Sequence, residues 1–168
     1  MADLSTVLAG NRTALDDLMA AAQRSAPVWT TPRAPGKWSP SQVVEHVARA
    51  LEESANVVAG MPSKFPTFPA LLRPLVRGLF FNRVLKSGTF PRAKTNKAFD
   101  PAAGPATPAE GRARLEDALA RFDQACRSRA AAGQSVSSTL FGTVSVESYA
   151  RFQELHARHH CGQMPVLP

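Results

Sequence analysis

Cysteines and long apolar runs are scarce in this sequence, and both shortages restrict what the protein can be. Its two cysteines, Cys126 and Cys161, are too few for a disulfide framework, so we expect free thiols and a cytoplasmic protein. No run of about 18 uncharged apolar residues occurs, so we expect neither a transmembrane helix nor a membrane partner. The N-terminal segment lacks a basic stretch followed by an apolar one, and no secretory signal is expected.

Acidic residues are missing between Ser54 and Phe99, where eight basic residues occur. The rest of the chain carries twelve basic and thirteen acidic residues and is nearly neutral. A basic block of this kind attracts anionic ligands, nucleic acids or membrane surfaces, and it also occurs as a solvated face. The stretch has no zinc-finger spacing, basic-zipper heptad or RNP-type aromatic segment, so nucleic acid is the weaker alternative. The eight residues are Lys64, Arg73, Arg77, Arg83, Lys86, Arg92, Lys94 and Lys97.

The length of 168 residues predicts one domain, covering residues 1–168. Apolar residues recur at helical spacing in four long segments, which predicts helices at about 4–24, 40–59, 108–132 and 146–164. Helix-start signals precede the last three of these segments. Ser39 and Thr107 are followed three residues later by Gln42 and Glu110, as in a capping box, and Ser145 suits the N-cap of the last helix.

A Pro-rich connection separates the second and third helices, at about 61–106. Within it, residues 72–85 are compatible with a short amphipathic helix, and the remainder is irregular by composition. A connection of this length is unusual in a compact domain and often lines a site. It also allows the helices on either side to run parallel. The sequence therefore predicts an all-α fold, a four-helix bundle with a long crossover that contains a short extra helix.

Histidine is also rare, yet three of the four histidines fall within five residues near the C-terminus. His156 and His160 are four residues apart on the inward face of the last helix, with Cβ atoms about 6 Å apart. His159 is rotated away and is expected to face solvent or a partner. The remaining histidine, His46, lies at the border of the apolar stripe of the second helix.

Two imidazoles at this spacing can bind one metal ion, although such pairs also occur as ordinary core or capping histidines. His46 supports the metal interpretation, because bundle cores build metal sites from side chains on facing helices. Three neutral imidazoles with one open position match a catalytic metal site. Glu45 and Cys161 are neighbours in sequence but point off the inward face, so we exclude them as ligands.

Two stretches of the sequence resemble the DinB/YfiT-like superfamily of small metal-binding four-helix bundles. They are "GKWSPSQVVEHV" and "FGTVSVESYARFQELHARHHCGQM". The resemblance implies a metal triad of His46, His156 and His160, with His159 in a position that does not ligate. It also implies that Gln163 orients a ligand or a bound water from outside the coordination shell. It further implies that the second and third helices are parallel, and that the protein forms a homodimer.

The resemblance implies a divalent-metal-dependent enzyme, either a hydrolase or a thiol S-transferase, acting on a small electrophilic substrate. The ion would be Zn²⁺ or Ni²⁺, with Fe or Mn as alternatives, because histidine ligands alone do not select one metal. A low-molecular-weight thiol is a further expected cofactor of the transferase. The basic crossover can hold an anionic substrate, with Arg73, Arg77 and Arg83 as candidates. The alternatives are a non-catalytic metal- or ligand-binding bundle and a protein that binds nucleic acid through its basic face.

Two aromatic residues, Trp38 and Phe141, have two possible roles. They either wall the substrate pocket or pack in the core, and composition favours the core.

Overall fold

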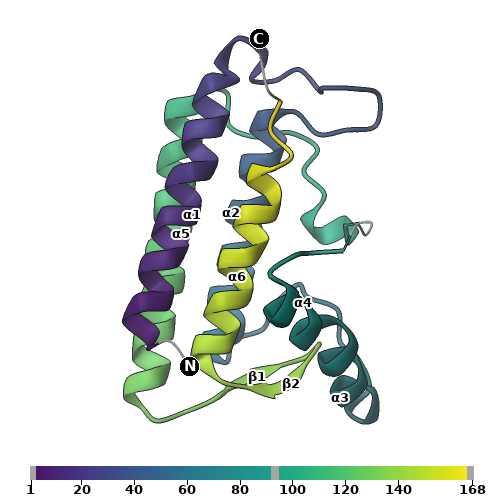
Figure 1. Ribbon diagram of the computed structural model, residues 1–168, viewed down its shortest axis with the longest axis vertical. Coiled ribbons are helices and arrows are strands. Elements are labelled where there is room, and N and C mark those ends of the chain that lie inside the picture. Colours follow the sequence, from purple (N-terminus) through teal and green to yellow (C-terminus); the bar gives the residue numbers. More distant parts are fainter. Residues whose placement is uncertain (1–2, 92–94, 166–168) are drawn as a thin grey trace.

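The computed structural model describes residues 3–91 and 95–165. Its main body is a bundle of four long helices (Figure 1), in which α1 packs mainly against α6 and α2 against α5. The all-α four-helix bundle predicted from the sequence is confirmed. Within the described residues, no helix is long and apolar enough to span a bilayer. The four helices are α1 (Leu4–Arg24), α2 (Pro40–Ala59), α5 (Pro108–Ala131) and α6 (Val146–Cys161).

The predicted capping residues begin the helices. The Ser39 hydroxyl accepts a hydrogen bond from the backbone N–H of Gln42, and the Gln42 side chain accepts one from the Ser39 N–H, so the box is complete. Thr107 likewise caps α5 by accepting from the N–H of Glu110. The Glu110 carboxylate, however, accepts from the N–H of Ala106 rather than from that of Thr107. The second predicted capping box is therefore only half formed.

The crossover contains one helical stretch from residue 70 to residue 87, slightly longer than the predicted helix. Its middle turn is a π-helix, a form that occurs mostly as single turns at functional sites. The crossover leads from the end of α2 back to the opposite end of the bundle, so that α2 and α5 run parallel (Figure 1). Arg92 and Lys94 of the basic block lie outside the described residues. The helical elements of the crossover are Ala70–Leu72, α3 (Arg73–Val76), Arg77–Phe81, α4 (Asn82–Ser87) and Lys97–Phe99.

A short antiparallel hairpin connects α5 to α6, and the sequence did not predict it. Its strands are β1 (Val136–Ser138) and β2 (Gly142–Val144), with Val136 opposite Val144. Gly142 has a φ of 70°, a conformation that favours glycine. After the hairpin, α6 begins at the predicted residue but ends at Cys161, three residues earlier than predicted.

The apolar stripe of α2 faces the core, as its helical spacing predicts. Val43, Val47, Leu51 and Val58 are all buried. Because α2 and α6 run in opposite directions (Figure 1), the beginning of α2 lies beside the end of α6. The bundle therefore brings the two histidine-containing segments to the same end of the molecule.

Candidate metal centre

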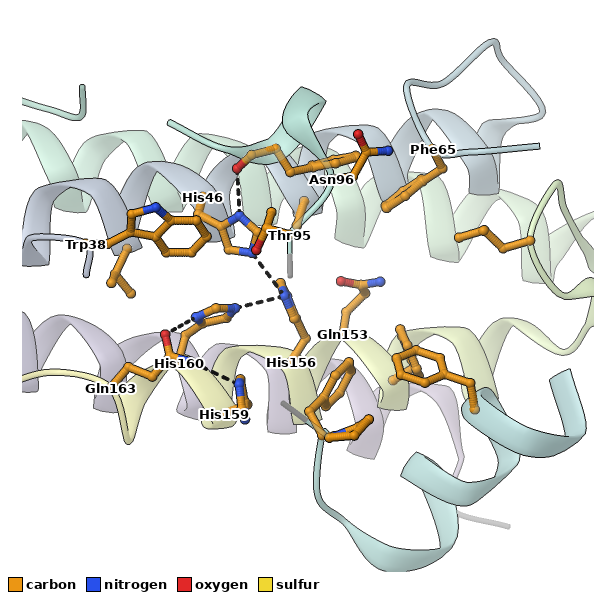
Figure 2. A pocket seen from close by; sticks show the side chains of 18 of the residues that line it. Trp38, His46, Phe65, Thr95, Asn96, Gln153, His156, His159, His160 and Gln163 are labelled. Carbon is orange, nitrogen blue, oxygen red and sulfur yellow. Dashed lines mark hydrogen bonds between the residues drawn. The ribbon is translucent and has the colours of Figure 1, made fainter. Parts of the chain in front are cut away.

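Three histidine side chains meet between α2 and α6 (Figure 2). His46 extends from α2, and His156 and His160 extend from consecutive turns of α6. The Nε2 atom of His156 lies 3.3 Å from that of His46 and 3.0 Å from that of His160. The structure thus brings together the three residues that the sequence singled out, and they form a group that could hold a metal ion.

Hydrogen bonds on the far side of two rings fix which nitrogen carries the proton. The Nδ1 atom of His46 lies 2.8 Å from the carbonyl oxygen of Phe99, which can only accept. The Nδ1 atom of His160 lies 3.0 Å from the Oε1 atom of Gln163. Both Nδ1 atoms therefore donate a proton, and both Nε2 atoms turn a lone pair toward His156. This is the arrangement of metal-ligating histidines, whose second nitrogen is held by an acceptor.

Hydrogen bonding within the cluster cannot satisfy all three Nε2 atoms. The Nε2 atom of His156 can donate at most one proton, either to the Nε2 atom of His46 or to that of His160. The Nε2 lone pair of the histidine that does not receive this proton then has no donor within the cluster. A cation among the three atoms would accept all three lone pairs. Four-coordinate zinc with Zn–N bonds of about 2.0–2.1 Å needs nitrogens about 3.3 Å apart. The two distances from His156, 3.3 and 3.0 Å, are close to this requirement, and all three ligand atoms lie within 4.8 Å of one another.

Burial keeps the cluster uncharged. His46 and His160 are buried, and His156 is partly exposed to the adjoining cavity. Loss of hydration lowers the pKa of His46, lowers that of His156 well below its ordinary value, and lowers that of His160 to about 3. The neighbouring imidazoles contribute to these lowered pKa values at His156 and His160. At neutral pH the three rings are neutral, which is the form that binds a metal.

His159 does not face away from the site as the sequence predicted. Its ring is half-buried and lines the cavity, with the ring of Phe90 at 5.8 Å. Its Nε2 atom lies 3.0 Å from the Nε2 atom of Gln163, which donates because its Oε1 faces His160. His159 thus holds the Gln163 amide in the orientation that supports His160. Its imidazole does not join the cluster of three.

A cavity of about 490 Å³ adjoins the three histidines. Trp38 and Phe141 both line it, so their wall position is observed, and Phe141 is also buried in the core. The Trp38 ring lies 4.7 Å from the ring of His46, and its indole N–H donates to the Asp100 carboxylate at 3.0 Å. The space is within the range of small-molecule sites.

The basic residues proposed from the sequence do not line the cavity. Arg73 and Arg77 instead donate to the backbone carbonyls of Phe68 and Thr143. These two hydrogen bonds connect the helical part of the crossover to its own preceding loop and to the hairpin. Arg83 is also absent from the described cavity lining. Among the described residues, the lysine and arginine side chains that line the cavity are Lys37 and Arg33, from the connection between α1 and α2.

The end of the crossover is fastened to the beginning of α2, and this positions His46. The Ser41 hydroxyl donates to the carbonyl of Pro105 at 2.6 Å, and the Gln42 amide donates to that of Pro101 at 2.9 Å. Gly104 passes so close that a Cβ atom there would lie 2.2 Å from the carbonyl oxygen of Ser41. Only glycine fits this contact. The same segment supplies the Phe99 carbonyl that holds the His46 ring.

Two further features of the site were not predicted. The Phe99 carbonyl belongs to the backbone, and nothing in the sequence marks it. Gln153 lines the cavity one turn before His156, on the inward face of α6. Its helical position was the available signal. Glu45, which we excluded as a ligand, has its carboxylate bound by Arg49 and Arg114.

Fold and site together define a class: four-helix bundles in which three histidines from two helices converge beside an aromatic cavity. The family model of the DinB superfamily matches residues 8–164, and the chain belongs to this superfamily. Comparison with curated proteins and with solved structures finds no match.

Proposed function

We propose that this protein is a divalent-metal-dependent enzyme in which His46, His156 and His160 hold the ion. The observation that carries the proposal is the convergence of three Nε2 atoms at the wall of a cavity large enough for a substrate. A three-histidine site leaves a coordination position for water or substrate, which is typical of catalytic rather than structural zinc. The reaction class is hydrolysis or transfer of a thiol to a small electrophile.

The ion would supply Lewis acidity, which lets a water or thiol lose its proton near neutral pH. The protein's own groups prepare the site for this chemistry. The Phe99 carbonyl and the Gln163 amide hold the His46 and His160 rings with their Nε2 atoms inward. Aromatic side chains form much of the cavity wall beside the histidines. No separate side-chain base is required for this mechanism.

Zn²⁺ and Ni²⁺ are the ions we favour, with Fe and Mn as alternatives, since imidazole ligands suit several of these metals. A low-molecular-weight thiol is the expected second substrate if the reaction is a transfer. An anionic group on either molecule would meet Arg33 and Lys37, which line the cavity. These two residues replace Arg73, Arg77 and Arg83 as candidates for anion binding.

The alternative is a bundle that binds a metal or a small ligand without turnover. Closed structural zinc sites usually have four protein ligands, whereas the described residues supply three here. This difference favours the enzyme.

Turnover measurements separate the two. Untagged protein loaded with Zn²⁺ or Ni²⁺ is assayed with a panel of thiols and a chromogenic electrophile, and with esters and amides in the absence of thiol. We expect turnover that His46→Ala, His156→Ala and His160→Ala each abolish, while Glu45→Gln, beside His46 in sequence, retains it. A variant of the triad with the normal rate would remove that residue from the site. Metal binding without turnover of any substrate would favour the binding protein.

The homodimer implied by the resemblance stays a prediction. Light scattering on eluting, untagged protein at several concentrations measures the mass directly. A mass of twice the chain's 18.0 kDa would confirm the dimer, and the mass of one chain would contradict it.

A further inference from the structure

The cavity continues past the histidines into a part that is lined mainly by aromatic rings. These rings come from separate elements and pack on one another: Phe90 lies 4.8 Å from Phe152, and Phe80 lies 5.9 Å from Phe152. We call this part of the cavity the aromatic half. It is lined by Phe65, Phe80, Phe90, Phe141 and Phe152.

Core packing explains only one side of these rings. Phe141 and Phe152 are 4% and 7% exposed, so both belong to the core as well as to the cavity wall. Space for a small molecule nevertheless remains between them and α2. Water in such a space finds few hydrogen-bonding partners, whereas an apolar group gains contacts with the rings. The aromatic half is therefore suited to an apolar occupant.

One polar side chain lies at the boundary between the aromatic half and the histidines. Gln153 is 4% exposed, and its side chain forms no hydrogen bond with the described residues. Figure 2 shows its amide projecting into the space between the helices, between His156 and Phe65. The Gln153 side chain lines the cavity, so its amide can donate and accept hydrogen bonds with an occupant of that space. Its position at the cavity wall suits it to hydrogen-bond the polar group of a ligand.

We propose that the aromatic half and Gln153 together form the binding subsite for an amphipathic substrate. The substrate has an apolar alkyl or aryl body and one carbonyl or carboxamide group. The body occupies the aromatic half, and the polar group lies between the Gln153 amide and the three Nε2 atoms. The proposal deepens the proposed function, on which it rests for identifying the histidine end as the reacting end.

Binding of a homologous series of primary amides tests this subsite. Acetamide, butyramide, hexanamide and octanamide are titrated into zinc-loaded protein and into EDTA-treated protein, with calorimetry and tryptophan fluorescence as readouts. We expect affinity to rise about fourfold with each methylene until the aromatic half is full. The rise persists in metal-free protein, because contacts between the alkyl chain and the aromatic rings do not require the ion. Affinity that does not depend on chain length would overturn the proposal.

Two substitutions affect different parts of this result. Ala50 lines the cavity one turn after His46, so Ala50→Leu takes up part of the space and lowers the chain length at which the affinity stops rising. Gln153→Leu lowers the affinity of every amide about fivefold or more, with the same increment per methylene. The control is Gln124→Leu, an equivalent change on the exposed face of α5. It leaves the amide affinities and the increment per methylene unchanged. Folding of each variant is checked by circular dichroism. An affinity in folded Ala50→Leu that levels off at the same chain length as in the original protein would place the apolar body elsewhere and overturn the proposal.

The test of the subsite can fail or succeed independently of the test of the proposed function. A chain-length dependence without metal binding or turnover would support the subsite and contradict the metalloenzyme. Metal binding and turnover with amide affinities that are independent of length would support the metalloenzyme and overturn the subsite.

Discussion

The Nε2 atoms of His46 and His156 lie 3.3 Å apart, although 110 positions separate the two residues in the sequence. The distance results from the antiparallel course of α2 and α6, which places the beginning of one helix beside the end of the other (Figure 1). The fold thus aligns the two segments, and short contacts around them set the orientation of each ring. The predictions below test these contacts separately.

Gln163 is expected to affect metal affinity without being a ligand. Its Oε1 atom accepts from Nδ1 of His160, so Gln163→Leu removes the acceptor and leaves the ring free to rotate. We expect metal affinity to fall about 10- to 100-fold. Gln163→Glu keeps an acceptor at this position and should retain affinity within a few-fold. Competition with a chelating dye measures both variants, and equal affinity in all three proteins would contradict this role.

Gly104 is expected to link the crossover to the site. A Cβ atom at this position would meet the Ser41 carbonyl at 2.2 Å, so Gly104→Ala displaces the segment that carries the Phe99 carbonyl. We expect a loss of about 1–3 kcal/mol in the free energy of unfolding, together with weaker metal binding. Gly78→Ala is the control, because no atom lies within 4 Å of the added methyl group. That variant should gain up to about 1 kcal/mol. Urea denaturation measures both, and equal effects would contradict the close contact.

The ion pair between Glu52 and Arg114 is expected to stabilise the packing of α2 against α5 in a pH-dependent way. Two short hydrogen bonds from Arg114, of 2.6 and 2.7 Å, lower the pKa of the Glu52 carboxyl below its ordinary value of 4.5. A carboxyl whose pKa is lower in the folded state stabilises the fold above pH 4.5, and this contribution is lost as the pH falls through the folded-state pKa. Because both groups are partly exposed, we expect about 0.5–1 kcal/mol.

Chemical denaturation of Glu52→Gln at several pH values measures this contribution. The variant should be less stable than the original protein at pH 7, and the difference should shrink as the pH falls below 4.5. Asp117→Asn is an equivalent change at an exposed acid of α5 and should have no such effect. A difference of the same size at pH 7 and at pH 3 would contradict the role of the ion pair.

The helices and the histidine cluster could be predicted because they depend on local patterns. Helical spacing placed His156 and His160 on one face, and the capping signal at Ser39 set the start of α2 and thereby the face of His46. The hairpin could not be predicted in the same way, since its strands of three residues are too short for a period of two to stand out. It forms because Val136 and Val144 are buried against the bundle.

The three arginines chosen from the basic block, Arg73, Arg77 and Arg83, are absent from the cavity lining that the structure describes. The count of charges pointed to the crossover, but Arg73 and Arg77 are bound to backbone carbonyls there. Arg33 and Lys37 belong to the connection before α2, and only the packing of the helices brings them to the histidine end. The position of His159 was wrong for a related reason. A helical wheel treats the direction away from the core as solvent, whereas here the crossover residue Phe90 covers part of that side.

Calorimetric titration of Zn²⁺ into untagged, EDTA-treated protein tests the central claim most directly. We predict one ion per chain and, at 100 times the dissociation constant, a gain of about 2.7 kcal/mol in the free energy of unfolding. Single alanine substitutions of His46, His156 and His160 should each remove the high-affinity site. Binding of much less than one ion per chain, or unchanged binding in any of the three variants, would contradict the three-histidine centre.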